Sequence, residues 1–271
     1  MYKNDRVAYN LSAKLYVYFI RQNLFIELWK LEVRCGKNLM CQNSFLKSDA
    51  YNIFLFSEMI RWKIAQWFEL KWWENYFHSK DKAQYYEWKK NYWQNLLDKI
   101  ANAVSVEPSD TIADLGCGPA GIFILFPKNK VVAIDPLLDK YESNLSFFSK
   151  SDYPNVHFQN VALEDFKSTQ KMDVVFCMNA INHVSNLQKS FQILSGVAKE
   201  KGKIVVTIDA HNHTFFKQLF RLIPGDILHP HQYDLKEYEN FLEQDACEVL
   251  ETMLLKHEFF FDHYMIVAEK K

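Results

Sequence analysis

The sequence predicts an α/β fold in which an open, twisted sheet of about seven strands follows an aromatic-rich helical N-terminal extension. Three observations support this prediction. Short apolar segments that favour β-strands alternate with helical segments from residue 111 onward. A glycine-rich turn directly follows the first of these strands. All seven tryptophans precede residue 94, so the chain also divides into two parts by composition.

We expect three regions in the chain: an extension at residues 1–58, a helical cap at residues 59–104 and a ligand-binding domain at residues 105–271. The first region contains one glycine, no proline and no sustained helical or alternating pattern. Met59 is therefore expected to be the start of the functional protein. The alternative is that the extension is an accessory helix pair or a segment that docks a partner.

The helical cap is predicted from residues 61–100, which contain neither glycine nor proline and many helix-forming side chains. The polar segment His78-Ser79-Lys80-Asp81 should divide them into two helices, with Asp81 as the N-cap of the second. Tryptophans and tyrosines recur at spacings of three to five residues, so each helix should bury one face. We expect these faces to pack against the sheet, or in part to cover the pocket for the substrate.

The rest of the chain is predicted to follow the order of an open α/β sheet. A short segment, Ile122 to Phe126, remains for the first crossover helix, so burial of its apolar side chains must stabilise it. The last two strands should form an antiparallel hairpin, and the insertion Ala210 to Asp234 should contain a helix at Phe215 to Ile223. Strands are expected near residues 111–115, 131–135, 156–161, 173–178, 203–209, 247–255 and 259–268, and helices near 137–149, 187–199 and 235–245.

The glycine-rich turn is the motif that indicates a ligand. Residues 114–121 read Asp-Leu-Gly-Cys-Gly-Pro-Ala-Gly, with glycines in the pattern Gly116-x-Gly118-x-x-Gly121. Glycine allows backbone conformations that other residues avoid, and it lets a ligand approach the amide groups of the turn. The next strand ends in Asp135, and an acid at this point can accept both hydrogen bonds of a ribose diol.

Asp114 narrows the choice of ligand. A carboxylate two residues before the first glycine would repel a nearby pyrophosphate, whereas it suits a ligand that bears an ammonium group. From about Ile112 to Ile204 the chain resembles the class I S-adenosylmethionine-dependent methyltransferases, in particular the small-molecule group called methyltransferase type 11. The segments Asp173 to Met178 and Ala198 to Val206 add to this likeness. The resemblance implies a Rossmann-like fold, an antiparallel last strand and S-adenosylmethionine as the cofactor.

The resemblance also implies roles for individual residues. The methionine part of the cofactor should border the glycine turn, and the ribose should bind Asp135. The adenine should contact the segment after the third strand, where the usual first acid of the family is absent. The expected cofactor-binding residues are Asp114, Gly116, Cys117, Gly118, Gly121, Asp135, Pro136, Ala162, Leu163, Glu164 and Asn179.

Two histidines, His183 and His231, are the candidate catalytic residues. Ligands of open α/β sheets bind at the carboxyl ends of the strands, which is where both residues are expected. Histidine titrates near neutral pH, so His183 could be the general base that a hydroxyl or an acidic carbon acceptor needs. An amine or thiol acceptor needs no base. The alternative for each histidine is a structural role, such as capping or packing a helix.

Composition argues against several classes of function. A net charge of −1 gives no electrostatic case for nucleic acid as a partner. Five widely spaced cysteines form neither a disulfide framework nor a zinc-binding spacing, so we expect reduced thiols in a cytoplasmic protein. Charged residues interrupt the apolar segment Tyr9 to Trp29, so no membrane span is expected, and a peripheral amphipathic helix is the alternative there. The pairs His211/His213 and His229/His231 have no cysteine or paired acid beside them, so no metal site is expected.

The expected function is methyl transfer from S-adenosylmethionine to a small-molecule acceptor, which the sequence does not identify. One alternative is a non-catalytic subunit or sensor that binds the cofactor and a partner protein. A nicotinamide-dependent oxidoreductase is another, but its Tyr-x-x-x-Lys pair should follow the glycine turn, whereas Tyr85/Lys89 and Tyr86/Lys90 precede it. The oligomeric state stays open.

Overall fold

The structure, a computed structural model, describes residues 62–213, 217 and 231–271. The chain divides into two units, Met1–Ile60 and Arg61–Lys271, and the described residues belong to the second unit. The expected extension at residues 1–58 and most of the helix expected at Phe215 to Ile223 lie outside the described residues.

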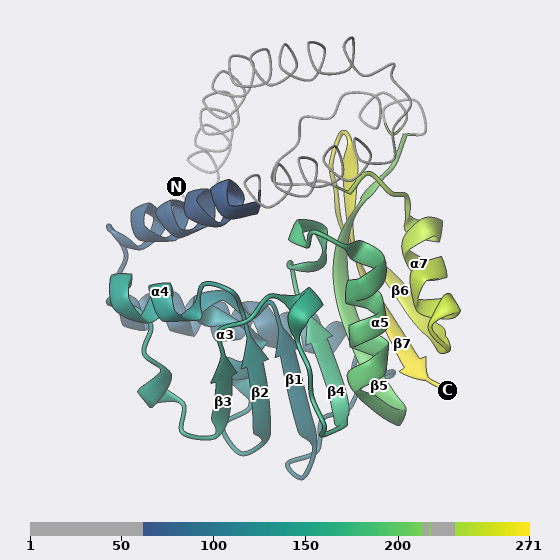
Figure 1. The fold of residues 1–271 in the computed structure, drawn as a ribbon, viewed down its shortest axis with the longest axis horizontal. Helices are drawn as coiled ribbons and strands as arrows, with labels where there is room; N and C mark the ends of the chain where they lie inside the picture. Colours follow the sequence, from purple (N-terminus) through teal and green to yellow (C-terminus); the bar gives the residue numbers. More distant parts are fainter. Residues whose placement is uncertain (1–61, 214–216, 218–230) are drawn as a thin grey trace, which may run out of the picture. The chain divides into compact units, whose positions relative to one another are not determined.

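One sheet of seven strands organises the domain. The strands are β1 (Thr111–Leu115), β2 (Lys130–Ile134), β3 (Val156–Gln159), β4 (Met172–Cys177), β5 (Ala198–His211), β6 (Cys247–His257) and β7 (Phe261–Lys270). Their order in the sheet is β3-β2-β1-β4-β5-β7-β6 (Figure 1). The strands β1 to β5 pair in parallel, and β7 runs antiparallel to both β5 and β6. The predicted open sheet and its final hairpin are confirmed.

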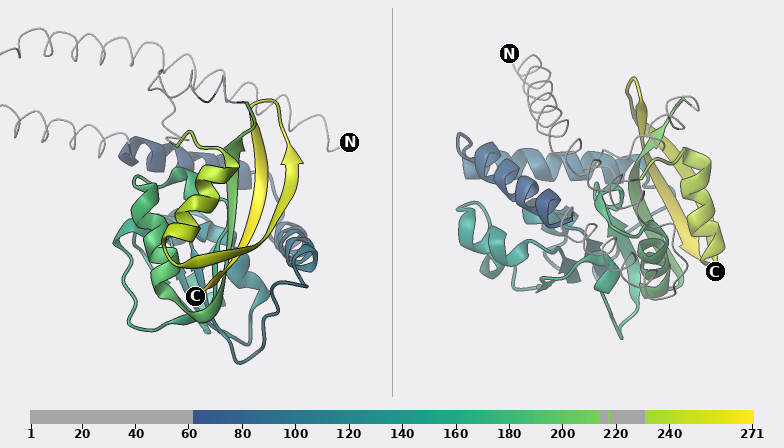
Figure 2. Two further views of the ribbon diagram at one scale, coloured as in Figure 1. Left: turned by 90° about the vertical axis from the view of Figure 1, so that its right-hand side faces the viewer. Right: turned by 45° about the horizontal axis from the view of Figure 1, so that its top comes forward.

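Helices cover both faces of this sheet. Figure 2 shows α5 (Leu187–Val197) and α7 (Leu235–Gln244) on one face and α3 (Lys82–Lys99) on the other, while α4 (Leu138–Asn144) follows β2. Residues 62–77 are also helical. Because successive side chains of a strand point to opposite faces, the strands contribute to two cores. Within β1, Ile112 packs in the core of α3, whereas Ala113 packs in the core of α5 and α7.

Two crossovers are shorter than the sequence predicted. The segment expected to be a helix at Ile122 to Phe126 is a 3-10 helix, Ile122–Leu125, and its first three residues are buried. The helix predicted near residues 137–149 is limited to α4, because the backbone becomes extended at Leu145 and the apolar residues that follow pack in the core. In both places burial of apolar side chains outweighs the tendency to form a regular helix.

The helical cap begins its second helix where the sequence predicted. The side chain of Asp81 accepts a hydrogen bond from the backbone N–H of Gln84 at 2.9 Å, so Asp81 is the N-cap of α3. The helix packs on the sheet domain through buried side chains that include Trp93, whose indole N–H donates to the carbonyl of Ala120 at 3.0 Å. The predicted packing of α3 against the sheet is therefore confirmed.

The tryptophans of the cap divide into buried and exposed residues. Trp93 is 3% exposed, whereas three others are exposed by 43–52%: Trp67, Trp72 and Trp88. The exposed rings pack mainly against neighbouring rings of their own helices, as in the stacked pair Trp72 and Tyr76. The aromatic residues of the cap therefore have different environments: Trp93 is buried against the sheet domain, whereas the exposed rings pack along the surface of their own helices.

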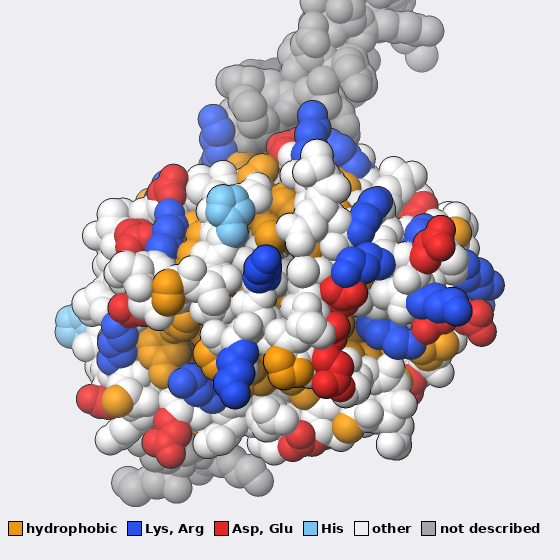
Figure 3. Space-filling view, turned by 90° about the horizontal axis from the view of Figure 1, so that it is seen from below, with side chains coloured by type: hydrophobic (Ala, Val, Ile, Leu, Met, Phe, Trp, Pro, Cys, Tyr) orange, Lys and Arg blue, Asp and Glu red, His pale blue; other side chains and the backbone are white. Residues whose placement is uncertain are grey.

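The surface at the amino ends of the parallel strands carries charges of both signs. Figure 3 shows Lys and Arg side chains interspersed with Asp and Glu side chains over this face. No single-sign patch forms there, in keeping with the near-zero net charge of the sequence. Within the described ranges, no helix combines the length and the hydropathy that crossing a membrane requires.

The buried indole of Trp93 should contribute measurably to stability. We expect Trp93→Phe to lower the free energy of unfolding by about 1–3 kcal/mol, because the carbonyl of Ala120 would lose its donor in a buried site. The control Trp88→Phe alters an exposed ring on the same helix and should change it by less than about 0.5 kcal/mol. Urea unfolding followed by circular dichroism measures both values, and equal losses would contradict the assigned role of the hydrogen bond.

Candidate functional site

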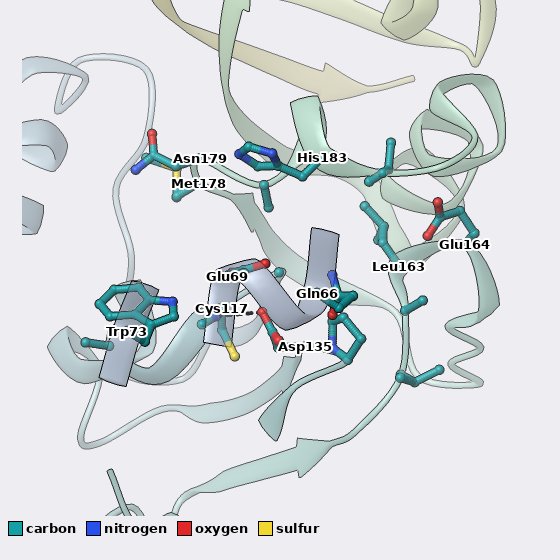
Figure 4. A pocket seen from close by; sticks show the side chains of 18 of the residues that line it. Gln66, Glu69, Trp73, Cys117, Asp135, Leu163, Glu164, Met178, Asn179 and His183 are labelled. Atoms are coloured by element: carbon teal, nitrogen blue, oxygen red, sulfur yellow. Dashed lines mark hydrogen bonds between the residues drawn. The ribbon is translucent and has the colours of Figure 1, made fainter. Parts of the chain in front are cut away.

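A pocket opens at the carboxyl ends of β1, β2 and β4, where the strand order of the sheet reverses. Ligands of open α/β sheets bind at such a switch point. Figure 4 shows the lining side chains converging on this space from the sheet and from the helical cap. The pocket is therefore lined both by the helical cap, which precedes residue 105, and by the domain that begins there.

The glycine turn after β1 forms one wall of the pocket. Gly116 and Gly118 have φ values of 79° and 57°, which side chains disfavour. A Cβ atom on Gly116 would also lie 2.3 Å from the Cβ atom of Ala180, whereas a Cβ atom on Gly118 would meet nothing closer than Trp73 at 3.9 Å. Gly116 thus permits a close approach of the loop after β4, and Gly118 keeps the wall open toward the pocket.

Asp135 connects this turn to the end of β2. One oxygen of its carboxylate accepts the N–H of Gly118 at 3.0 Å, and the other accepts the N–H of Leu137 at 2.8 Å. Burial, together with the negative charge of Glu69, raises the pKa of Asp135 to about 7. Asp135 and the following Pro136 both line the pocket, as expected from the position of the ribose acid.

Asp114 and Gly121 lie behind the turn, outside the residues that line the pocket. The carboxylate of Asp114 is 1% exposed and accepts the N–H of Phe123 at 3.0 Å. A Cβ atom on Gly121 would lie 2.3 Å from this carboxylate, so glycine is needed for the chain to pass. Burial raises the pKa of Asp114 to about 7. In the structure these two residues hold the shape of the turn.

The segment after β3 forms the wall expected for the adenine. Ala162, Leu163 and Glu164 all line the pocket. One oxygen of the Glu164 carboxylate accepts hydrogen bonds from the hydroxyl of Ser185 at 2.7 Å and the N–H of Asn186 at 3.1 Å. This side chain thereby fixes the start of α5 in addition to lining the pocket. Adenine recognition by this segment stays a prediction.

The loop after β4 carries Asn179 and His183 into the pocket. Asn179 has a φ of 57°, and its N–H donates to the hydroxyl of Thr207 at 2.7 Å. His183 ends the 3-10 helix Ile181–His183, and Figure 4 shows its ring on the pocket wall beside Asn179. The preceding residue, Asn182, is buried and donates to the carbonyl of Asp209 at 3.0 Å. The loop that presents His183 is therefore anchored to β5.

His231 is placed differently from His183. It does not line the pocket, and its Nε2 lies 2.7 Å from the carbonyl oxygen of Val184, to which Nε2–H can donate. Burial lowers the pKa of His231, and the hydrogen bond to Val184 offsets part of this effect. Of the two predicted catalytic histidines, His183 lines the pocket, whereas His231 contacts the residue that follows His183. Among the described residues there is also no group of three or more possible metal ligands.

The helical cap supplies a wall that the sequence predicted only in part. Trp62, Gln66, Glu69 and Trp73 follow one face of the helical residues 62–77 and line the pocket. Covering of the pocket by some of the tryptophans was the alternative to packing on the sheet, and no role in the pocket was predicted for Gln66 and Glu69. Their helical spacing within an aromatic face was the available signal. From α3, Lys89 also lines the pocket, with its ammonium group 4.1 Å from the centroid of the Trp93 ring.

These residues fit a nucleoside that carries an amino acid. The space beside the backbone of Gly118 leaves room for the amino-acid part of such a ligand. Asp135 supplies a buried hydrogen-bond acceptor, and Lys89 supplies a cation on the wall formed by α3. Gln66 Oε1 is buried and has no hydrogen-bond partner among the described residues. A ligand with hydrogen-bond donors would satisfy this atom.

Comparison with known proteins identifies the family. A model of a methyltransferase domain matches residues 107–245, about half of the chain. The chain belongs to this family. It is a methyltransferase domain of the Rossmann-like class I fold, for which the cofactor is S-adenosylmethionine.

Curated relatives carry compatible names at low identity. The chain is 26% identical over 174 residues to a protein of Invertebrate iridescent virus 6 named as methyltransferase 235L, covering 58% of this chain and 62% of that protein. It is also 26% identical over 167 residues to the ubiquinone biosynthesis O-methyltransferase of Rickettsia bellii, covering 60% of this chain and 68% of that protein. The chain thus spans less than two thirds of the viral relative.

Solved structures agree on the fold. The YcgJ protein of Bacillus subtilis superimposes with a TM-score of 0.53 at 16% identity, covering 66% of this chain and 99% of that protein. The predicted family, fold and cofactor are confirmed by these comparisons together.

The two left-handed glycines should differ in their tolerance of a side chain. Gly116→Ala is expected to abolish folding or ligand binding, because strain adds to the clash with Ala180. Gly118→Ala should lower the free energy of unfolding only by the strain of a left-handed residue, about 1–2 kcal/mol, although its Cβ would occupy space that the wall leaves open to a ligand. Thermal unfolding and calorimetry with S-adenosylhomocysteine measure both effects. Equal tolerance of the two substitutions would contradict the close approach at Gly116.

The Glu69 and Asp135 carboxyl groups should make stability depend on pH. Both pKa values are raised by folding, so the stabilisation is complete below about pH 4, the ordinary pKa range of carboxyl groups, and is lost as the pH rises toward 7. Glu69→Gln removes one charge, so its unfolding free energy relative to wild type should increase between pH 5 and pH 8.

Each unfolding free energy is compared with that of wild type at the same pH. The pH-dependent contributions of groups that both proteins share, such as Asp114, Tyr141 and His231, therefore cancel in the difference. Glu74→Gln is the control on the same helix: the neighbouring Lys71 lowers the pKa of Glu74, so its difference from wild type should stay constant over this range. Urea unfolding at three pH values gives the result. A pH-independent difference for Glu69→Gln would show that folding does not raise the pKa of Glu69.

Proposed function

We propose that the protein transfers the methyl group of S-adenosylmethionine to a hydroxyl group of a small aromatic acceptor. The observation that carries this proposal is the position of His183, which lines the same pocket as the glycine turn and Asp135. A base beside the cofactor site suits an acceptor that must lose a proton. The name of the Rickettsia relative, an O-methyltransferase, supports the choice of oxygen.

The chemistry asks the protein mainly for alignment and for removal of a proton. The sulfonium of the cofactor makes its methyl group electrophilic, so the acceptor oxygen must be held in line with it. His183, whose ring lies on the pocket wall, is the residue we assign to take the hydroxyl proton as the oxygen becomes nucleophilic. The anchored loop around Asn182 keeps this ring at the wall of the pocket.

Aromatic side chains favour a flat acceptor. Trp62 and Trp73 line the pocket on the side of the helical cap, and aromatic faces hold planar rings through stacking. The near-zero net charge of the sequence gives no electrostatic argument for a polyanionic acceptor. A small phenol or catechol fits these features.

Replacement of His183 tests the proposal. We expect His183→Ala and His183→Gln to slow turnover by about a hundredfold or more, the usual effect of losing a general base, with little change in the affinity for S-adenosylhomocysteine. His78→Gln, at an exposed turn outside the pocket lining, is the matched control and should leave both quantities unchanged.

The assay uses methyl-labelled S-adenosylmethionine with phenols, catechols, anilines and thiols, and with a metabolite extract, followed by mass spectrometry of the products. Labelled O-methyl products that depend on His183 support the proposal. Labelled amines or thiols formed equally well by the His183 variants would overturn the oxygen assignment.

A further inference from the structure

We infer that Glu69, on the helical cap, is a second acid of the ribose subsite, so that Glu69 and Asp135 each accept a hydrogen bond from one ribose hydroxyl. This inference deepens the proposed function and rests on cofactor binding in this pocket. It assigns to residues 62–77 the task of binding the nucleoside as well as covering the acceptor.

Position is the first argument. Glu69 and Asp135 line the same pocket although they belong to different elements, the helical cap and the end of β2. Figure 4 shows the two carboxyl groups in the same part of the pocket, with Gln66 beside them. A ligand held by Asp135 therefore lies within the reach of the helical cap.

Orientation is the second argument. The hydroxyl of Tyr141, a fully buried residue of α4, donates to Oε1 of Glu69 at 3.1 Å. The side chain of Trp73, one turn further along the helix, favours the charged form of Glu69 and lowers its pKa, against the larger effect of burial. Asp135 is fixed in turn by two backbone N–H groups. Both acids are thus held in place before any ligand binds, as a binding site requires.

Charge is the third argument. Burial raises the pKa of Glu69, and the charge of Glu69 contributes to the raised pKa of Asp135, so the two groups repel each other when both are ionised. Lys89, which also lines the pocket, lowers the pKa of Asp114 through its charge. Two O–H donors between the acids would stabilise their charged forms. A ribose diol supplies two such donors.

An ammonium group would also suit two carboxylates, so the test must separate the nucleoside from the amino acid. The probes are S-adenosylhomocysteine, which has both parts, and 5′-methylthioadenosine, which has only the nucleoside, together with the 2′-deoxy and 3′-deoxy forms of the latter. The proteins are wild type, Glu69→Gln and the control Glu74→Gln from the same helix. Calorimetry gives the dissociation constants.

We expect Glu69→Gln to weaken the binding of both S-adenosylhomocysteine and 5′-methylthioadenosine by about tenfold, because a charged hydrogen-bond acceptor is replaced by a neutral one. Glu74→Gln should bind as wild type. For one of the two deoxy probes, the one that lacks the hydroxyl bound by Glu69, Glu69→Gln and wild type should bind equally.

Three outcomes would overturn the inference. If Glu69→Gln binds S-adenosylhomocysteine more weakly than wild type does but binds 5′-methylthioadenosine equally well, Glu69 would instead contact the ammonium group of the amino acid. Unchanged binding of both would leave Glu69 a structural partner of Tyr141. If Glu69→Gln does not fold, wild type decides: removal of either hydroxyl must weaken binding, and a deoxy probe that binds as tightly as its parent excludes a second acid. A wild-type protein that binds neither parent ligand would instead refute cofactor binding itself.

Discussion

The buried carboxylate of Asp135 is the interaction on which the site depends. It accepts hydrogen bonds from the backbone N–H groups of Gly118 and Leu137, and these bonds connect the turn after β1 to the segment after β2. The strand order of the sheet reverses between β1 and β4, and β2 is the other neighbour of β1, so the bonds that shape the turn also place an acid next to this switch point. Pocket geometry and hydrogen bonding are therefore one feature of the fold.

Holding acids in this way has an energetic cost. Asp114 and Asp135 are both buried, and folding raises both pKa values to about 7, which means that the ionised forms are disfavoured in the native protein. The two residues use this state differently. Asp114 faces the backbone and supports the 3-10 helix, whereas Asp135 faces the pocket, where a ligand with hydrogen-bond donors can stabilise its charge. Burial of Asp135 therefore lowers the stability of the native protein at a position where this acid can accept hydrogen bonds from a ligand.

Sequence patterns predicted the fold more fully than the site. Periodicity and glycine spacing gave the seven strands, the hairpin and the cap at Asp81, because these features depend on local backbone preferences. The positions of Asp114 and His231 could not be read in this way, since each depends on which surface the folded chain presents. Glu69 was missed for the same reason: a single glutamate on an aromatic helix gains meaning only when Tyr141 and Asp135 lie beside it.

The pocket is lined partly by the region that matches the methyltransferase family and partly by the helical cap outside that match. The match to the methyltransferase domain begins at residue 107, yet the helical cap before it contributes six residues to the pocket lining: Trp62, Gln66, Glu69, Trp73, Lys89 and Trp93. The matched region supplies the turn, the acid after β2 and the loop that carries His183. The wall that faces them is built by sequence outside the match. If the protein acts as proposed, differences in acceptor between relatives should therefore follow the cap, because the cap lines the side of the pocket that faces the shared turn and acid.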